Sequence, residues 1–411
     1  MNTPVEEIFI SGMGEKRKII DDFCKASPMY GVVARKVKDR YLEDLSGHYL
    51  YDFATQDYLG IGFDPKQVGA AVEATRKYGT VVAWCRLVAT VDLFTRAEDE
   101  VAQLVGAEAS SIFASTTLLN HGVIPALMGG EGVMFLDKSA HATMYEGAKI
   151  ARDSGSLLVS FPQNDIESLE KLLIEHKDTK KKLIITDGVY SMTGDYADLP
   201  SLDRLAKKYN TLLYVDDAHG FGVVGENPDA GHPYGHKGNG LVRYFGLNYD
   251  NILYVGCFSK SYGTFGAFAA CSHKMKQFLL SQATPHDLGG AGPASAMAAL
   301  LTGLEINRQR GEDKRRQIAR LTQTAIDGLV SLGYTVENKT GFPIIYVKAE
   351  NPDSMIEVSK ILYQNHILLT LSPYPMVKKS EEGYRVTVTC TNTEAEVAQL
   401  IEAFKIAKKL L

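Results

Sequence analysis

Three residues that could do covalent chemistry follow two apolar segments of the sequence. Asp216 and His219 come just after the apolar run Leu212 to Val215, and Lys260 follows the run Ile252 to Val255 among small residues. A lysine at a buried edge is available as the unprotonated amine that a Schiff base requires. A nearby aspartate can hold a pyridine nitrogen protonated, which makes the ring an electron sink. The residue types therefore predict imine chemistry, provided that the two segments are strands of one sheet.

The elements that would position these residues are short apolar runs, which alternate with helical patterns from about residue 100 onward. Runs that are apolar almost throughout are typical of parallel strands with helices on both faces. Ligands of such sheets bind at the carboxyl ends of the strands, where Asp216, His219 and Lys260 fall. We therefore predict an α/β fold with a mainly parallel sheet. The predicted strands are Ser111–Ala114, Val133–Leu136, Leu157–Phe161, Leu183–Thr186, Leu212–Val215, Ile252–Val255 and Ala267–Ala270.

The alternation stops where the apolar stretch Pro293 to Asn307 runs into the charged stretch Arg308 to Arg320, and a domain boundary is expected nearby. The order of elements beyond it is typical of a small α+β domain. The predicted domains are an N-terminal segment (1–55), a large domain (56–300) and a small C-terminal domain (301–411). The N-terminal segment should hold a helix at Val5–Cys24 and a hairpin around Ser46–His48. The small domain should hold strands at Ile344–Val347, Ile367–Leu371 and Arg385–Thr389 and helices at Asp353–Gln364 and Thr393–Lys409.

Composition excludes several classes of function. The chain has 411 residues, with 44 basic and 49 acidic side chains and 45% hydrophobic residues, which is typical of a globular protein. A net charge of −5 favours neither nucleic acid nor an anionic membrane as a partner. No apolar run approaches the roughly 18 residues of a membrane span, and the N-terminus lacks a signal-peptide pattern. We therefore expect a cytoplasmic protein. Its five scattered cysteines indicate reduced thiols, with neither disulfides nor a zinc site.

Two further motifs have a weaker interpretation. The segment Gly220 to Gly225 matches a dinucleotide-binding pattern, but four residues separate it from the preceding strand and the following residues cannot open a helix. A nucleotide site is therefore not predicted. His232 and His236 lie in a turn broken by proline and glycine, with no helix to align them, so we predict an exposed loop and no metal site.

Three segments carry a resemblance to a known family. Asp187–Asp195, Val215–Gly225 and Phe258–Gly266, in this order, resemble the α-oxoamine synthases, which are fold-type I enzymes dependent on pyridoxal 5'-phosphate (PLP). In its motifs the chain is most similar to the bacterial serine palmitoyltransferases and the 2-amino-3-ketobutyrate CoA ligases. The resemblance extends from Asp57 to the Arg385 strand. It implies an aspartate aminotransferase-like PLP-dependent transferase fold and a homodimer with a shared active site.

The resemblance also implies a role for each matching residue around the cofactor. Lys260 would hold PLP as a Schiff base, and Asp216 would pair with the pyridinium nitrogen. His219 and Ser191 would lie beside the phenolic oxygen of the ring. His141 would stack on the ring and help to orient the substrate, although without the family context it could equally be a core histidine.

Further residues are implied at the phosphate and at the substrate. Backbone amides at Thr116 and Thr117 would bind the phosphate, since helix N-termini favour anions. Ser259 and Cys257 belong to the same predicted set, although Cys257 replaces the threonine of relatives and so removes a hydroxyl donor. Arg385 would grip the amino-acid carboxylate with two prongs, unless it is an ordinary surface arginine. The remaining predicted substrate contacts are Gln56, Asp57 and Arg86.

The implied reaction joins a small amino acid to an acyl-CoA with loss of carbon dioxide, giving an aminoketone and CoA, with Lys260 as the base that removes the Cα proton. Two alternatives remain open. The chain could perform another PLP-dependent reaction on an amino acid, namely transamination, decarboxylation or retro-aldol cleavage, or it could be a non-catalytic partner subunit. The segments that depart from the family face the substrate, which indicates an unusual substrate pair or loop drift. They are Gln56–Asp57, Trp84, Cys257 and His286–Gly292.

Overall fold

The computed structural model describes residues 5–10, 14–38 and 41–409, which fall into two compact units. The large unit comprises Asp57–Ala319, and the small unit comprises Met1–Gln56 with Arg320–Leu411. The N-terminal segment thus groups with the C-terminal residues instead of standing apart. The division between the units falls inside one continuous helix, α12 (Ala294–Ser331), so the charged stretch that suggested a boundary is helical and is not a linker.

The large unit is built on a seven-stranded sheet with the strand order β4-β10-β9-β8-β7-β5-β6. All of its strands are parallel except β10, which runs antiparallel to both β9 and β4. This confirms the predicted mainly parallel sheet. The strands are β4 (Ala109–Phe113), β5 (Val133–Asp137), β6 (Leu157–Phe161), β7 (Lys182–Asp187), β8 (Leu212–Asp216), β9 (Ile252–Cys257) and β10 (Ala267–Cys271).

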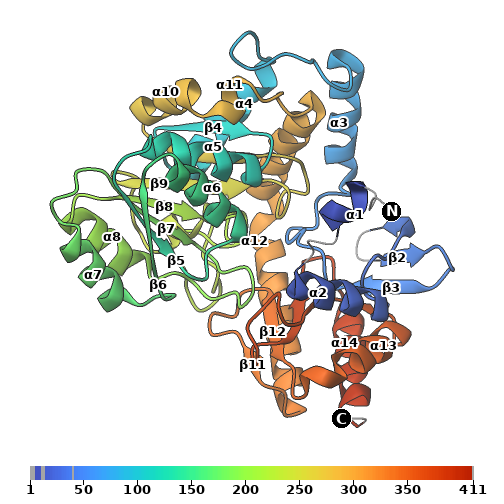
Figure 1. The fold of residues 1–411 in the computed structure, drawn as a ribbon. Helices are drawn as coiled ribbons and strands as arrows, with labels where there is room; N and C mark the ends of the chain where they lie inside the picture. Colours follow the sequence, from blue (N-terminus) through green and yellow to red (C-terminus); the bar gives the residue numbers. More distant parts are fainter. Residues whose placement is uncertain (1–4, 11–13, 39–40, 410–411) are drawn as a thin grey trace. The chain divides into compact units, whose positions relative to one another are not determined.

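Burial explains why these segments form strands inside a layered fold. Every residue of β4, β5, β7, β9 and β10 is buried, whereas the edge strand β6 has exposed positions. Helices cover the sheet, and α5 and α6 pack side by side on one face of it (Figure 1). The other helices of this unit before α12 are α3 (Pro65–Tyr78), α4 (Asp92–Val105), α7 (Ile166–Glu175), α8 (Leu199–Lys208), α9 (Leu241–Tyr244), α10 (His273–Gln282) and α11 (Thr284–Asp287), besides α5 (Thr116–Met128) and α6 (Ala142–Asp153).

The small unit contains two four-stranded sheets and the helices that pack on them. One sheet has the order β1-β2-β3-β13 and the other β11-β12-β15-β14. Its strands are β1 (Ala34–Lys38), β2 (Tyr41–Asp44), β3 (Tyr49–Asp52), β11 (Val336–Glu337), β12 (Ile344–Lys348), β13 (Ile367–Leu368), β14 (Thr370–Ser372) and β15 (Gly383–Thr387). Its helices are α1 (Val5–Ile10), α2 (Glu15–Ala26), the 3-10 turn Pro352–Ser354, α13 (Met355–Gln364) and α14 (Glu394–Lys408).

The predicted helix Val5–Cys24 is wrong as a single element. The structure has α1 and α2 instead, and Gly14, with an extended backbone, precedes α2 as its N-cap. The intervening residues 11–13 lie outside the described part of the chain. The predicted hairpin is present, with β2 and β3 joined at a glycine, Gly47, whose φ is +90°.

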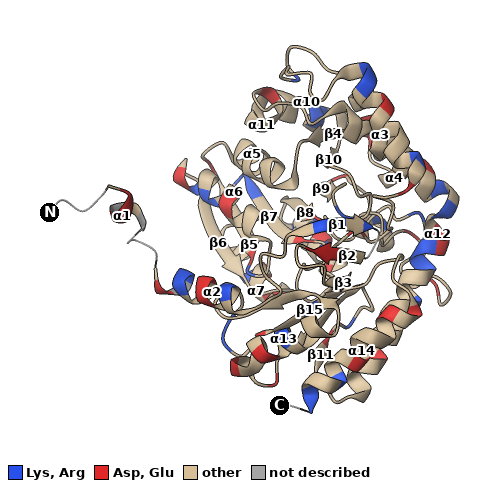
Figure 2. Ribbon diagram, turned by 90° about the vertical axis from the view of Figure 1, so that its right-hand side faces the viewer, with Lys and Arg blue, Asp and Glu red and all other residues tan. Residues whose placement is uncertain are grey.

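Charged side chains follow the helices and avoid the central strands. In Figure 2, α12 and α14 carry many acidic and basic residues, whereas the strands of the large sheet are mostly uncharged. The described helices include none that is long and apolar enough to span a bilayer. The charged residues that do occur at strand ends of the large sheet are therefore the ones to examine for chemistry.

Candidate active site

A pocket with a cavity volume of about 50 Å³ opens at the carboxyl ends of β5, β7, β8 and β9. Seven of the residues that the sequence analysis proposed line this pocket, although they come from five separate segments. Its lining residues are Thr116, Thr117, His141, Thr143, Asp187, Val189, Ser191, Asp216, Ala218, His219 and Lys260. The fold therefore brings the proposed amine, carboxylate and imidazoles into one cavity.

Asp216 is the last residue of β8 and is 4% exposed. Its Oδ2 accepts a hydrogen bond from Nδ2 of Asn120 at 2.9 Å, and its Oδ1 accepts one from the backbone N–H of Ala218 at 3.2 Å. Asn120 is itself held, because its Oδ1 accepts a hydrogen bond from the hydroxyl of Tyr214 at 2.5 Å. This network fixes the carboxylate in one orientation at the base of the pocket.

His219 is held by a tyrosine. The hydroxyl of Tyr58 lies 2.8 Å from Nδ1 of His219, and both side chains are buried. Tyr58 follows Asp57, where the resemblance to the family begins, but the sequence analysis gave it no role. Because a hydrogen bond at one ring nitrogen of a histidine fixes which nitrogen is presented on the other side, Tyr58 positions the imidazole for contact with a ligand.

Lys260 lies in the short connection from β9 to the antiparallel strand β10. The connection closes on itself, since the N–H of Phe258 donates to the carbonyl of Gly266 at 2.9 Å and the N–H of Gly263 donates to the carbonyl of Lys260 at 3.0 Å. Gly263 has a φ of +55°, and a Cβ there would come within 2.6 Å of the Cα of Gly62. Glycine is therefore required at this position, and the loop holds the Lys260 backbone in place.

His141 and Asp187 meet above the ends of β5 and β7. The N–H of His141 donates to Oδ1 of Asp187 at 3.3 Å, and its Nδ1 lies 2.9 Å from the hydroxyl of Thr143. Partial desolvation lowers the pKa of His141; the Asp216 carboxylate opposes this shift, and the charge of Lys260 adds to it. Burial, reinforced by the neighbouring Asp216, raises the pKa of Asp187 well above its usual range. Burial thus disfavours the charged form of both side chains.

Asp217 lies beneath the site and has a structural role. Its Oδ2 accepts hydrogen bonds from the N–H of Leu241 at 2.8 Å and from the hydroxyl of Tyr254 at 2.9 Å, and burial raises its pKa to about 7. A Cβ at Gly188 would come within 2.6 Å of its Oδ1, and one at Gly220 within 2.1 Å. The first glycine of the apparent dinucleotide motif is therefore needed for packing against this carboxyl group. As predicted, the segment forms turns and no helix opens there.

An anion-binding element closes the other side of the pocket. Helix α5 begins after Ser115, whose hydroxyl accepts a hydrogen bond from the N–H of Leu118 at 3.2 Å. Thr116 and Thr117 form the first turn, where backbone N–H groups have no acceptor within the helix. Together with the helix dipole, such groups favour a phosphate.

Four proposed residues of the large unit do not line the pocket. Cys257 is buried and donates from its thiol to the carbonyl of Ala218 at 3.3 Å, whereas Ser259 is exposed. The carboxylate of Asp57 accepts from the backbone N–H of Gly62 at 3.1 Å, within its own turn. Arg86 forms a buried ion pair, in which its Nη1 lies 2.7 Å from Oε1 of Glu98. Local structure thus engages the side chains of Asp57, Arg86 and Cys257.

Gln56 and Arg385 belong to the small unit. Arg385 lies in the middle of β15, opposite Tyr346 of β12, and is 4% exposed. Gln56 is half-buried at the end of the N-terminal segment. Arg385 is therefore a buried arginine in a strand, and the interpretation as a surface arginine is wrong.

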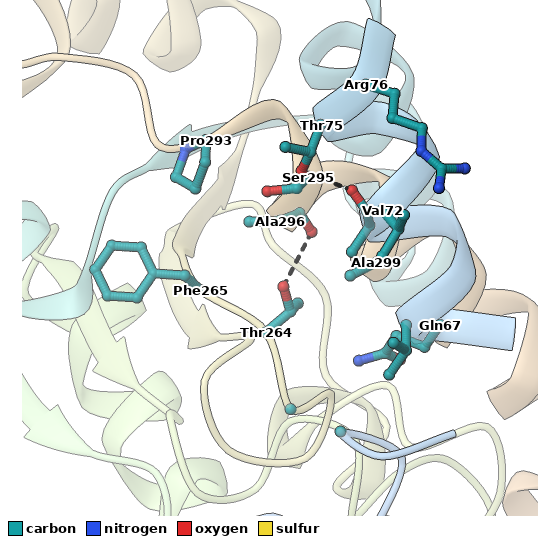
Figure 3. Close-up of a pocket in the computed structure, with 14 residues that line it drawn as sticks. Gln67, Val72, Thr75, Arg76, Thr264, Phe265, Pro293, Ser295, Ala296 and Ala299 are labelled. Atoms are coloured by element: carbon teal, nitrogen blue, oxygen red, sulfur yellow. Dashed lines mark hydrogen bonds between the residues drawn. The ribbon is translucent and has the colours of Figure 1, made fainter. Parts of the chain in front are cut away.

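A second, larger cavity of about 590 Å³ lies in the large unit beside the loop that follows Lys260 (Figure 3). Its walls come from α3, from Gly263 to Phe265 and from the start of α12, where the hydroxyl of Thr264 donates to the carbonyl of Ala296 at 3.1 Å. Apolar side chains remain accessible on its rim, since Val68, Val72 and Phe265 are 43–52% exposed. It has no cluster of ionisable groups that would suggest catalysis.

The groups of the first pocket fit PLP. Lys260 offers the amine for the aldehyde, Asp216 is a fixed carboxylate for the ring nitrogen, and the start of α5 suits the phosphate. A mainly parallel α/β unit with this site at its strand ends defines a PLP-dependent enzyme. Residues 53–404 match the family model for aminotransferase class I and II, so the chain belongs to that family.

Individual relatives are more specific than the family model. The chain is 33% identical to 8-amino-7-oxononanoate synthase of Geobacter sulfurreducens, over 87% of this chain and 88% of the relative. It is 30% identical to serine palmitoyltransferase of Bacteroides ovatus, over 88% and 89%. The solved serine palmitoyltransferase of Sphingomonas wittichii has the same fold, with a TM-score of 0.88, 24% identity and coverage of 100% of this chain and 99% of that one. These relatives confirm the resemblance to the α-oxoamine synthases.

Proposed function

We propose that the protein is a PLP-dependent C-acyltransferase, which condenses a small amino acid with an acyl-CoA and releases carbon dioxide, CoA and an aminoketone. The observation that carries the proposal is the gathering of Lys260, Asp216, His219 and His141 in one pocket at the strand ends. The names of the relatives, a serine palmitoyltransferase and an 8-amino-7-oxononanoate synthase, support an acyl transfer to an amino acid. A cytoplasmic location stays a prediction from the sequence.

Each pocket residue has a part in this reaction. When bound, PLP supplies an electron sink that stabilises a carbanion at the amino acid Cα. Lys260 would hold the cofactor and, once the amino acid has displaced its amine, remove the Cα proton. Asp216 would keep the ring nitrogen protonated, and His219 with Ser191 would bind the phenolic oxygen. His141, in its neutral form, would cover the ring face and bind the substrate.

The roles away from the pocket divide into two groups. Arg385 stays the proposed partner of the amino-acid carboxylate, with Gln56 as a further substrate contact. For Arg86 we propose stabilisation of the large unit instead, since Glu98 occupies its guanidinium. Asp57 and Cys257 would shape the site through the hydrogen bonds that they make with the backbone.

Borohydride trapping combined with an acyl-CoA assay tests the proposal. The holoenzyme should absorb near about 420 nm, and borohydride should attach the cofactor to Lys260. Lys260→Ala should lose the label and all turnover. Lys181→Ala is the matched control, because Lys181 lies just before the opposite end of β7, where its Nζ donates to the carbonyl of Met128. Amino acid turnover without release of free CoA thiol would favour a transaminase, decarboxylase or lyase, and absence of the absorbance would favour a non-catalytic subunit.

We also propose that the protein is a homodimer, and that the second copy covers the rim of the cavity in Figure 3. Exposed apolar side chains of this size on one rim support an interface: Phe265 is 52% exposed and Val72 43%. Phe265→Asp should shift the sedimenting species from dimer to monomer. Ile174→Asp, at an equally exposed position (52%) on α7, should leave the dimer intact. A Phe265→Asp protein that sediments as a dimer would place the interface elsewhere.

A further inference from the structure

A cluster of metal-binding side chains lies outside the catalytic pocket, in the loop formed by residues 226–239, here called the histidine loop. One possible ligand atom each from Asp229, His232 and His236 lies within 4.8 Å of the others. The sequence analysis expected no metal site because no helix aligns the two histidines. In the structure a turn aligns them instead, through antiparallel bridges that pair Asp229 with His232 and Glu226 with His236.

The distances within the cluster match a tetrahedral metal ion. Oδ2 of Asp229 lies 3.3 Å from Nδ1 of His232 and 3.4 Å from Nε2 of His236. Ligand atoms bound at about 2.0–2.1 Å in a tetrahedron are about 3.3–3.4 Å apart. A single ion between the three side chains would therefore need little rearrangement of the loop.

Backbone contacts hold the carboxylate for this purpose. Oδ1 of Asp229 accepts hydrogen bonds from the N–H groups of Gly231 at 2.7 Å and of His232 at 2.9 Å. These two contacts engage Oδ1 and leave Oδ2 facing the two imidazoles. On the far side of the second imidazole, Oε2 of Glu312 lies 3.8 Å from Nδ1 of His236. This separation is too long for a hydrogen bond, and Glu312 also pairs with Arg315, so Glu312 would have to move closer to act as the carboxylate partner of a metal-bound imidazole.

An arginine stands against metal binding in the free protein. Nη1 of Arg316 lies 2.9 Å from Nε2 of His232. Because a guanidinium only donates, Nε2 is the acceptor and the ring proton is on Nδ1, facing Asp229. A metal on Nδ1 replaces that proton, so Nε2 becomes the N–H and Arg316 must turn away. Arg316 is 47% exposed and also pairs with Asp313, so it has room to do so.

We propose that Asp229, His232 and His236 form a binding site for a divalent transition-metal ion of the zinc class, with a water in the fourth position. Two imidazoles and a carboxylate select such ions over calcium and magnesium. The site would fasten the histidine loop, which is hydrogen-bonded to the segment after His219 through the N–H of Gly222 and the carbonyl of Gly238 at 2.8 Å. Its role is to stiffen this loop, and the chemistry at Lys260 does not depend on it.

Titration of the tag-free, chelator-treated holoenzyme with Zn²⁺ and with Co²⁺ tests the site. We expect one equivalent to bind by calorimetry, and the Co²⁺ spectrum to show tetrahedral bands without thiolate absorption. His236→Ala should abolish binding, and Glu312→Gln should weaken it by about tenfold. His121→Ala is the matched control, since this histidine also faces a carboxylate, Glu146, at 2.8 Å but is not part of the cluster.

The variant Arg316→Met allows the site to be tested even where the wild-type protein binds Zn²⁺ too weakly to measure. Removing the competing guanidinium should tighten Zn²⁺ binding by about tenfold, and Zn²⁺ should raise the melting temperature of this variant more than that of the wild type. Circular dichroism checks that each variant folds. Absence of stoichiometric binding in both the wild type and Arg316→Met, or binding that survives in His232→Ala/His236→Ala, would overturn the proposal.

Discussion

A substitution at Arg86 tests whether this arginine stabilises the large unit or binds the substrate. Its Nη1 lies 2.7 Å from Oε1 of Glu98 and donates to the carbonyl of Ile112 at 3.0 Å. Both side chains of the pair are less than 10% exposed, and Nζ of Lys276 lies 2.8 Å from the other oxygen of Glu98. Burial raises the pKa of Glu98, but the two positive partners outweigh it and hold the pKa below its usual value. Arg86→Met would leave this buried carboxylate with one charged partner, Lys276, and the N–H of Ile112.

The expected cost of Arg86→Met follows from that geometry. Breaking a buried ion pair by removing one partner costs about 3–5 kcal/mol, because the other charge is left buried. Lys276 continues to compensate Glu98, so we expect the lower end, about 3 kcal/mol of unfolding free energy. Lys276→Met should lower the free energy of unfolding by less, about 2 kcal/mol, because Glu98 then keeps Arg86, which is the more deeply buried of its two positive partners. In an Arg86→Met/Glu98→Leu protein, part of the loss should be recovered, because the buried carboxylate is gone and the remaining charge, Lys276, is partly exposed to solvent.

Urea denaturation of the holoenzyme followed by circular dichroism measures these differences, and steady-state kinetics on the folded protein measures KM for the amino acid. A structural Arg86 predicts a lower unfolding midpoint with KM nearly unchanged. If Arg86→Met instead keeps its stability within about 0.5 kcal/mol of the wild type and raises KM, the ion pair is not what Arg86 provides, and the sequence-based assignment to the substrate is restored.

Three further changes have defined outcomes. Burial, with a smaller contribution from Arg86, lowers the pKa of His286 from 6.5 to about 4. Between these pH values the unfolded chain binds more protons than the folded protein, so the free energy of unfolding should fall by about 3 kcal/mol from pH 6.5 to pH 4. Urea denaturation of His286→Phe at several pH values should lack this contribution. Gly220→Ala should cost about 1–3 kcal/mol by thermal melting, since its Cβ would meet Asp217, and a neutral effect would contradict this packing. Asn120→Ala removes the donor to Asp216 and should weaken PLP binding about tenfold in an absorbance titration, whereas unchanged affinity would show that the carboxylate needs no such support.

The strands of the large unit could be predicted from the sequence because burial on both faces requires runs of residues that are apolar almost throughout. Val133–Asp137 and Ile252–Cys257 are apolar almost throughout, and both are strands within two residues of the prediction. The N-terminal helix could not be predicted correctly, because apolar periodicity does not register the extended backbone at Gly14. The two units divide between Ala319 and Arg320, within the charged stretch, but its helical structure could not be predicted, since a charged surface turn and an exposed helical stretch such as Arg308–Arg320 have the same composition.

The residues of the candidate site likewise fall into those that could be predicted from the sequence and those that could not. Lys260 and Asp216 could be placed because each follows a recognisable strand, and strand ends of a parallel sheet meet at one edge. Asn120 could not, because its contact with Asp216 joins residues 96 positions apart, although it lies one helical turn after Thr116. The convergence of the side chains in the histidine loop could not be predicted, because it depends on turn geometry, and residue spacing gives no measure of that.

The connection between β9 and β10 has a consequence for how the enzyme is assembled. Lys260 lies in a nine-residue connection between paired antiparallel strands, in which Cys257 is opposite Ala267. Closing so short a return costs little chain entropy. The connection that carries the Lys260 amine is therefore formed once the neighbouring strands β9 and β10 have paired.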